Sequence, residues 1–132
     1  MMHWDISEGK GRRCVFGQAG AQTSFACATA DDQGNCYTGG ANSLIYVWAG
    51  KSLRRTCGVH KQGFVGAILW NSGKLYSGGK DGRVCITDTS TMECVRAVEF
   101  GVLPRAIDAL GTKLVVGLRT GSIVECDLET NE

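Results

Sequence analysis

Two groups in the sequence have the residue types of a catalytic or cofactor site. Cys57 and His60 are three residues apart and could form a nucleophile–base pair. Residues an odd number apart on a strand face opposite sides, so we interpret this spacing as coincidental. The segment Gly9-Lys10-Gly11-Arg12-Arg13-Cys14 begins like a dinucleotide fingerprint, but it lacks the third glycine and no βαβ unit surrounds it. We interpret it as a basic hairpin loop.

The cysteines and histidines do not have the spacing of a metal site. The seven cysteines include no Cys-x-x-Cys pair, and the sequence has two histidines, His3 and His60, so no closed zinc site is expected. An odd number of cysteines favours reduced thiols in a cytosolic protein over a secreted disulfide scaffold. Asp31-Asp32 is typical of a turn rather than of an acid–base pair. The sequence therefore predicts a cytoplasmic protein that is not an enzyme and has no cofactor and no metal.

Length and charge limit the classes of partner. The 132 residues suit one domain of ordinary size. The net charge of +1 argues against a grip by the whole domain on nucleic acid or on an anionic membrane. No apolar run approaches the ~20 residues that span a bilayer. We therefore expect protein partners, no nucleic acid and no membrane.

A repeat of 39 residues organises the chain. It is marked by Gly39, Gly78 and Gly117, which we expect to be structural glycines in equivalent settings. A shift without gaps also aligns small and apolar positions across the three units. These columns include Phe25, Phe64 and Leu103, then Ala28, Ala67 and Ala106, then Ile45, Val84 and Ile123.

Each unit has the pattern of four short strands. In the second unit we predict strands over residues 64–70, 74–77, 83–87 and 92–100. Asn71-Ser72-Gly73 and Asp81-Gly82 are the turn signals between the first three. Apolar residues nowhere recur at helical spacing over ten residues. Four antiparallel strands in ~40 residues predict an all-β fold of β-propeller blades.

The ends of the predicted third strands resemble the WD40-repeat family. Tyr46-Val47-Trp48-Ala49 stands where the family has its Trp-Asp pair, Thr87-Asp88 and Cys126-Asp127 follow at the same position, and Trp4-Asp5 is an earlier copy. Val59-His60 matches the family's Gly-His imperfectly. The resemblance implies WD40-type propeller blades, about three four-stranded antiparallel blades in a partial ring.

The same resemblance implies a buried network in the second blade. His60 would lie in the loop that leads into the blade, Asp81 in the turn that faces it, and Ser77 would supply a hydroxyl. Thr87 replaces the tryptophan of the family's network, so we expect the network to be incomplete. Trp48 is expected to pack in its blade with its N–H bonded, whereas Trp70 either packs or forms a second contact site.

The order of motifs over most of the chain looks like the propeller region of the echinoderm microtubule-associated protein-like (EML) family. Its more specific parts are Ser77-Gly78-Gly79-Lys80-Asp81 and Pro104-Arg105. Other matching segments, shared with many WD40 proteins, are Tyr37-Thr38-Gly39, His60-Lys61-Gln62-Gly63-Phe64 and Leu114-Val115-Val116-Gly117. The resemblance implies a cytoskeletal protein-interaction scaffold that binds tubulin or microtubules.

The repeat also predicts boundaries within one propeller segment. Residues 1–21 would end a preceding blade, 22–60 and 61–100 would form two blades, and 101–132 an incomplete one. Open blade ends would expose apolar faces, which soluble monomers rarely tolerate. We interpret the chain as a piece of a larger propeller. The alternative is self-association of two copies through these ends.

Four basic residues are expected in loops on one face of the blades: Lys61, Lys80, Arg105 and Arg119. They are either solvated surface charges or a patch for an acidic protein partner, which for an EML-like chain would be tubulin. The alternative to the cytoskeletal interpretation is a generic WD40 scaffold or an assembly module of another multiprotein complex.

Overall fold

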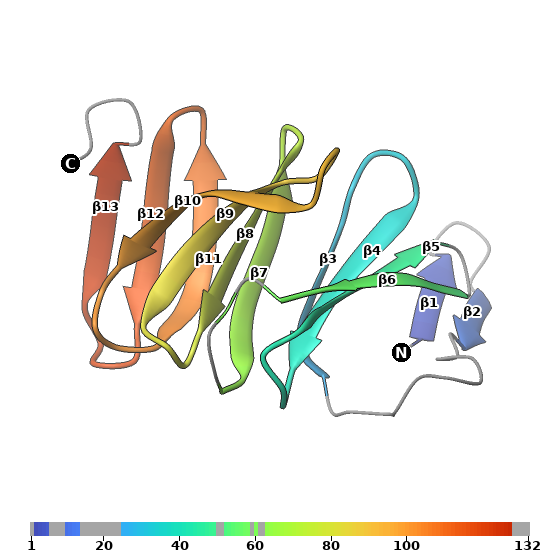
Figure 1. Ribbon diagram of the computed structural model, residues 1–132, viewed down its shortest axis with the longest axis horizontal. Helices are drawn as coiled ribbons and strands as arrows, with labels where there is room; N and C mark the ends of the chain where they lie inside the picture. The colour runs from blue at the N-terminus through green and yellow to red at the C-terminus, as the bar shows by residue number, and fades with distance from the viewer. Residues whose placement is uncertain are drawn as a thin grey trace.

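The structure is a computed structural model that describes residues 2–5, 10–13, 25–49, 52–58, 60 and 63–127. Every regular element in these ranges is a β-strand (Figure 1). None of them is a helix that could cross a membrane. The strands are β1 (Met2–Asp5), β2 (Lys10–Arg13), β3 (Phe25–Ala30), β4 (Asn35–Gly40), β5 (Ile45–Ala49), β6 (Ser52–Cys57), β7 (Val65–Asn71), β8 (Lys74–Gly79), β9 (Arg83–Asp88), β10 (Glu93–Glu99), β11 (Pro104–Leu110), β12 (Lys113–Leu118) and β13 (Ile123–Asp127).

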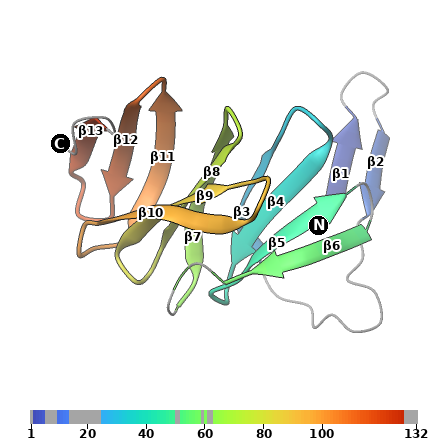
Figure 2. The same cartoon turned by 45° about the horizontal axis from the view of Figure 1, so that its top comes forward.

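The strands form separate antiparallel sheets in chain order. β3 to β6 and β7 to β10 are four-stranded meanders, β11 to β13 is a three-stranded one, and β1 pairs with β2. The sheets stand side by side like the leaves of a fan (Figures 1 and 2). The innermost strands β3, β7 and β11 contact one another in that order. The predicted all-β architecture of propeller blades is thus confirmed.

Two apolar clusters hold neighbouring sheets together. The first joins Tyr37, Ile45 and Val47 of the β3–β6 sheet to Val65 and Leu75 of the β7–β10 sheet. The second joins the opposite side of the β7–β10 sheet to the β11–β13 sheet; its buried members are Tyr76, Val84, Ile86, Ala109, Leu114 and Val116. Successive side chains on a strand point to opposite faces, so Leu75 and Tyr76 serve different clusters. The middle sheet is therefore covered on both faces.

The three repeat glycines occupy equivalent register positions. Gly39, Gly78 and Gly117 pair with Ile45, Val84 and Ile123 of the following strands. A Cβ on Gly39 would lie 2.6 Å from Val65 Cγ1, and one on Gly78 would lie 2.7 Å from Pro104 Cβ. At Gly117 the nearest described atom is Ala106 Cβ, at 3.7 Å. The first two glycines thus permit close approach of the next sheet.

The alignment without gaps is wrong by one residue at β3. Cys27, rather than Ala28, pairs with Gly39 as Ala67 pairs with Gly78 and Ala106 with Gly117. Likewise, Phe25 takes the register position of Val65 and Pro104 rather than that of Phe64 and Leu103. The cause is the turn that follows. Five residues separate the paired Ala30 and Cys36, whereas four separate the equivalent Trp70 and Leu75.

Candidate protein-interaction face

Three of the four predicted basic residues lie at one edge of the sheets, where β8 and β12 end and β7 and β11 begin. Lys80 and Arg119 directly follow β8 and β12, and their backbone N–H groups donate to Phe64 O and Leu103 O, at 2.9 Å in both cases. Arg105 is the second residue of β11. We call this edge, at the bottom of Figure 1, the basic face. Lys61 lies outside the described residues.

The three cations are exposed, and none of them takes part in an ion pair with another described residue. Two carboxylates of described residues lie at the same edge. Asp81 is held by His60, whereas Glu99, at the end of β10, is exposed and was missed by the sequence analysis. Leu103 is buried and therefore offers no contact surface. The basic face thus has an excess of positive charge, carried by side chains that are accessible to a partner.

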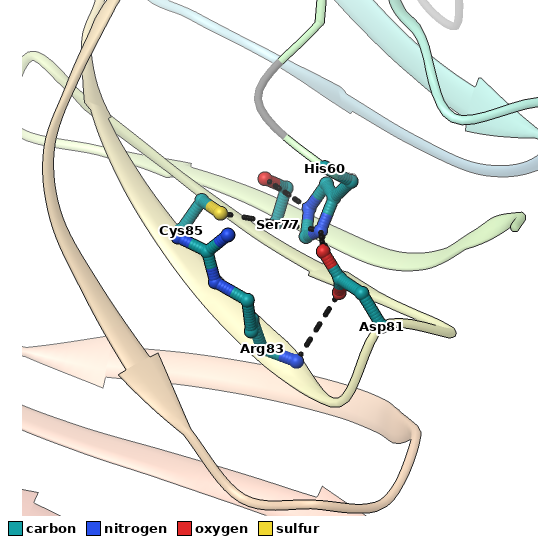
Figure 3. Close-up of polar contacts among 5 residues, drawn as sticks. All are labelled: His60, Ser77, Asp81, Arg83 and Cys85. Carbon is teal, nitrogen blue, oxygen red and sulfur yellow. Dashed lines mark hydrogen bonds and ion pairs between the residues drawn. The ribbon is translucent and has the colours of Figure 1, made fainter. Parts of the chain in front are cut away.

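His60, Ser77 and Asp81 meet in the interior beside this face (Figure 3). His60 Nδ1 lies 3.0 Å from Asp81 Oδ1, and His60 Nε2 lies 2.9 Å from Ser77 Oγ. In a neutral imidazole with the proton on Nδ1, Nδ1 donates to the carboxylate and Nε2 accepts from the serine hydroxyl. The side chains of His60 and Asp81 are 0% and 4% exposed. Such a network fixes the loop before β7 against the turn after β8.

Two further residues complete the surroundings of His60. A Cβ on Gly79 would lie 2.6 Å from His60 Nδ1, so the ring occupies the space that this glycine leaves. The Cys85 thiol is 4.0 Å from the same nitrogen. The Gly78-Gly79 pair is visible in the sequence as part of the repeat, although the sequence analysis predicted a structural role only for Gly78. Cys85 gave none.

The hydrogen bonds of the family's network are divided between two sheets of this chain. Thr87 is fully buried, and its hydroxyl has no hydrogen-bond partner among the described residues. In the preceding sheet Trp48, at the equivalent position, donates from Nε1 to Thr38 Oγ1 at 2.8 Å. Trp48 is fully buried with its N–H bonded, in agreement with the sequence analysis. Thus the first sheet has the tryptophan bond and the second has the histidine–aspartate bond.

The chemistry of these groups is structural rather than nucleophilic. Burial raises the pKa of Cys85 to about 12, so the thiol beside His60 stays protonated at neutral pH. The Cys57 thiol bonds Met92 O at 3.3 Å, and burial raises its pKa too. Neither thiol therefore forms a reactive pair with His60. Within the described ranges, no group of three His, Cys, Asp or Glu side chains is placed to hold a metal ion.

Comparison with known proteins agrees with this architecture. The chain is 47% identical over 118 residues to the ciliary WD repeat-containing protein ctxp80 of Euplotoides octocarinatus, a match over 89% of this chain and 16% of that protein. No family model matches the chain.

Two solved structures superpose on nearly the whole chain. They are the structure of U3-55K, with a TM-score of 0.82 and 19% identity, and the crystal structure of RRP9 WD40 repeats, with a TM-score of 0.84 and 18% identity. Both matches cover 99% of this chain, and they cover 43% and 42% of those chains. The chain therefore spans less than half of each of these three proteins, and it has the fold of WD40-repeat β-propeller blades.

Proposed function

We propose that this chain, a set of WD40-repeat β-propeller blades, is a non-catalytic, EML-like cytoskeletal scaffold that binds tubulin or microtubules through its basic face. The observation that carries the proposal is the position of Lys80, Arg105 and Arg119. They are exposed at one edge of adjacent sheets, and two of them occupy the same position in consecutive repeats.

The geometry suits recognition of an extended acidic surface. Equivalent positions on two adjacent sheets each carry a positive charge, and a rigid scaffold keeps its loops in place when a partner binds. Tubulin has an acidic surface, and the named relative is a ciliary protein. Cilia are built on microtubules. In this proposal the protein is cytoplasmic, and Lys61 remains a predicted contact residue for the acidic partner.

Co-sedimentation with microtubules tests the proposal. The triple variant Lys80→Glu, Arg105→Glu and Arg119→Glu should lose most binding, and added salt should weaken binding of the unchanged protein because ions screen exposed charges within ~10 Å. The matched control, Arg54→Glu, Arg55→Glu and Lys113→Glu, has the same charge change at exposed positions elsewhere. Both variants should keep the circular dichroism spectrum of the unchanged protein. Equal binding by the two variants would refute the proposal.

A second candidate function, an assembly module of another complex, is favoured by the outer face of the β11–β13 sheet. Val115 and Ile123 are 38% and 77% exposed, whereas the equivalent Tyr76 and Val84 are covered by the next sheet. An apolar sheet face of this kind suits another blade or a second copy of the chain. Mass measured by light scattering over a range of concentrations tests self-association: growth with concentration supports it, and a constant monomer mass contradicts it.

A further inference from the structure

A cleft of about 520 Å³ opens between the β3–β6 and β7–β10 sheets, at the edge opposite the basic face. Three turns that are distant in sequence form its rim: residues 31–35 at the start of β4, residues 72–73 before β8 and residues 89–90 before β10. These turns lie at the top of Figure 1, where the β9–β10 turn reaches toward β3 and β4. Trp70, near the end of β7, and Arg54, on β6, also line the cleft.

The walls are held in place before any ligand arrives. The Asp31 carboxylate accepts hydrogen bonds from the N–H groups of Gln33 and Asn35, the Asn35 amide and the Tyr37 hydroxyl, each at 2.9 Å. Thr89 Oγ1 donates to Gly73 O at 2.9 Å, which ties two turns of one sheet together. A rigid cleft has a low entropic cost of ordering on binding.

Four polar side chains of the walls use hydrogen-bond donors within the protein. Asn35 and Tyr37 donate to Asp31, Ser72 donates to Asn71, and Ser90 donates to Asp88. These groups can therefore offer a ligand mainly the lone pairs of their oxygens. The exposed Asp32 carboxylate adds a negative charge, and no other described residue bonds its side chain. This part of the cleft suits a ligand group that is rich in donors and positively charged.

Trp70 adds an aromatic surface to the same end. A guanidinium or ammonium group over the face of tryptophan is attracted by the ring quadrupole, and an arginine plane can also stack on it. The backbone N–H of Trp70 donates to Thr29 Oγ1 of the neighbouring sheet at 3.1 Å, which fixes the residue at the junction of the two sheets. A cationic side chain in the cleft would lie between this ring and the two aspartates.

The other end of the cleft has the opposite charge. Arg54 lies between the main cleft and a smaller cavity of about 80 Å³, which Arg55 and Met92 also line. Both arginines are exposed on the edge strand β6. The two cavities share Asn35, Tyr37, Arg54, Thr89 and Ser90, and thus form one groove with acidic residues at one end and basic residues at the other.

We propose that this groove binds an extended segment of a partner protein that carries an arginine or lysine side chain close to an acidic one. The cation fits between Trp70 and Asp32, and the acid fits beside Arg54 and Arg55. The groove lies at the edge opposite the basic face, so a partner here would leave the basic face free. The inference does not depend on the proposed binding of microtubules.

NMR titration of the ¹⁵N-labelled full chain tests the groove. The probe is acetyl-Gly-Arg-Ala-Glu-Gly-amide, and the control peptide has glutamine in place of arginine. We expect saturable shifts of the Trp70 indole N–H and of the Gln33 and Asn35 amides, with roughly 10-fold weaker binding of the control peptide. Absence of saturable shifts, equal binding of both peptides, or shifts confined to the basic face would each overturn the proposal.

Two variants with the same charge change test whether the arginine peptide binds at Asp32. Asp32→Lys should weaken binding of the arginine peptide by roughly 10-fold, since it replaces an attractive charge with a repulsive one. Glu99→Lys, at an exposed position on the opposite edge, should leave the affinity unchanged. Neither side chain is buried, so both variants should fold. Equal affinities for the two variants would contradict the assignment. Asp32 lies at the edge opposite the basic face, so Asp32→Lys should co-sediment with microtubules as the unchanged protein does. This result is expected whether or not the peptide binds in the groove.

Discussion

The indole Nε1 of Trp48 donates a hydrogen bond to Thr38 Oγ1 at 2.8 Å, with both side chains buried. In the next sheet the position of Trp48 is taken by Thr87, whose buried hydroxyl has no partner among the described residues. Thr38 and Thr87 thus both bury a hydroxyl, but the two hydroxyls differ in hydrogen bonding. One hydroxyl satisfies a buried donor, and the other is itself unsatisfied.

Valine substitution should therefore have opposite effects at the two threonines. Thr87→Val removes an unsatisfied polar group without a change of shape and should raise the free energy of unfolding by about 1 kcal/mol. Thr38→Val removes the hydroxyl that accepts from the Trp48 N–H and should lower the free energy of unfolding by roughly 1–3 kcal/mol. Urea unfolding followed by tryptophan fluorescence measures both. Loss of stability in Thr87→Val would show that its hydroxyl does have a partner.

Alanine at the repeat glycines should show the difference between covered and open positions. Gly78→Ala forces a Cβ to within 2.7 Å of Pro104 Cβ and should cost roughly 1–3 kcal/mol of stability. Gly117→Ala meets Ala106 at an ordinary 3.7 Å and should be neutral or stabilising by up to ~1 kcal/mol, since it restricts the unfolded chain. Thermal unfolding of the pair compares them. Equal losses at both glycines would contradict the structure.

Asp31 should make stability depend on acid. Burial acts to raise its pKa, but hydrogen bonds from Asn35, Gln33 and Tyr37 together lower it below the ordinary 3.8. The ionised group therefore stabilises the fold fully above its unfolded pKa, and this contribution is lost as the pH falls through the lower folded pKa. Asp31→Asn should be less stable than the unchanged protein by about 1 kcal/mol at pH 7.

The difference in stability between Asp31→Asn and the unchanged protein should disappear at a pH below the folded pKa of Asp31. Urea unfolding from pH 7 to pH 2.5 follows it. Asp32→Asn is the control, because no hydrogen bond from a described residue reaches its carboxylate, and its curve should parallel that of the unchanged protein. A constant gap between Asp31→Asn and the unchanged protein over the whole range would contradict the assignment.

Thiol alkylation should separate the cysteines by burial. Burial raises the pKa of Cys27 to about 11, partly offset by a hydrogen bond to the Gly39 backbone, and raises that of Cys85 to about 12. At pH 8 about one Cys27 thiol in a thousand is then ionised, and fewer still at Cys85. Iodoacetamide should modify the exposed Cys94 first, as read by peptide mass spectrometry. In urea the three should react alike; equal rates in the folded protein would refute the burial of Cys27 and Cys85.

The sequence predicted the sheets well because each repeat has its own turn signals and apolar alternation. Gly39, Gly78 and Gly117 mark the same register in three sheets, and a spacing of this kind is visible without coordinates. The one-residue shift at Cys27 was not predicted, because the extra turn residue precedes Gly39. It therefore displaces only β3, and the spacing from Gly39 onward is unchanged.

The candidate sites were only partly predictable. His60, Ser77 and Asp81 were found through a family resemblance, and the structure brings them together. The cleft beside Trp70 was not foreseen as a cavity, because it depends on where three turns of different sheets meet in space. Each of these turns, taken alone, has the composition of an ordinary solvent-exposed turn.

The contacts of Gly39 with Val65 and of Gly78 with Pro104 have a further consequence for curvature. They join the second strand of one sheet, β4 or β8, to the innermost strand of the next, β7 or β11, where absence of a side chain lets one sheet approach the next. Neighbouring sheets are thereby closer together near their innermost strands than near their outer strands. The angle between neighbouring sheets that results determines how many sheets would complete a ring. A bulkier residue at either glycine would widen the thin end and flatten the arc.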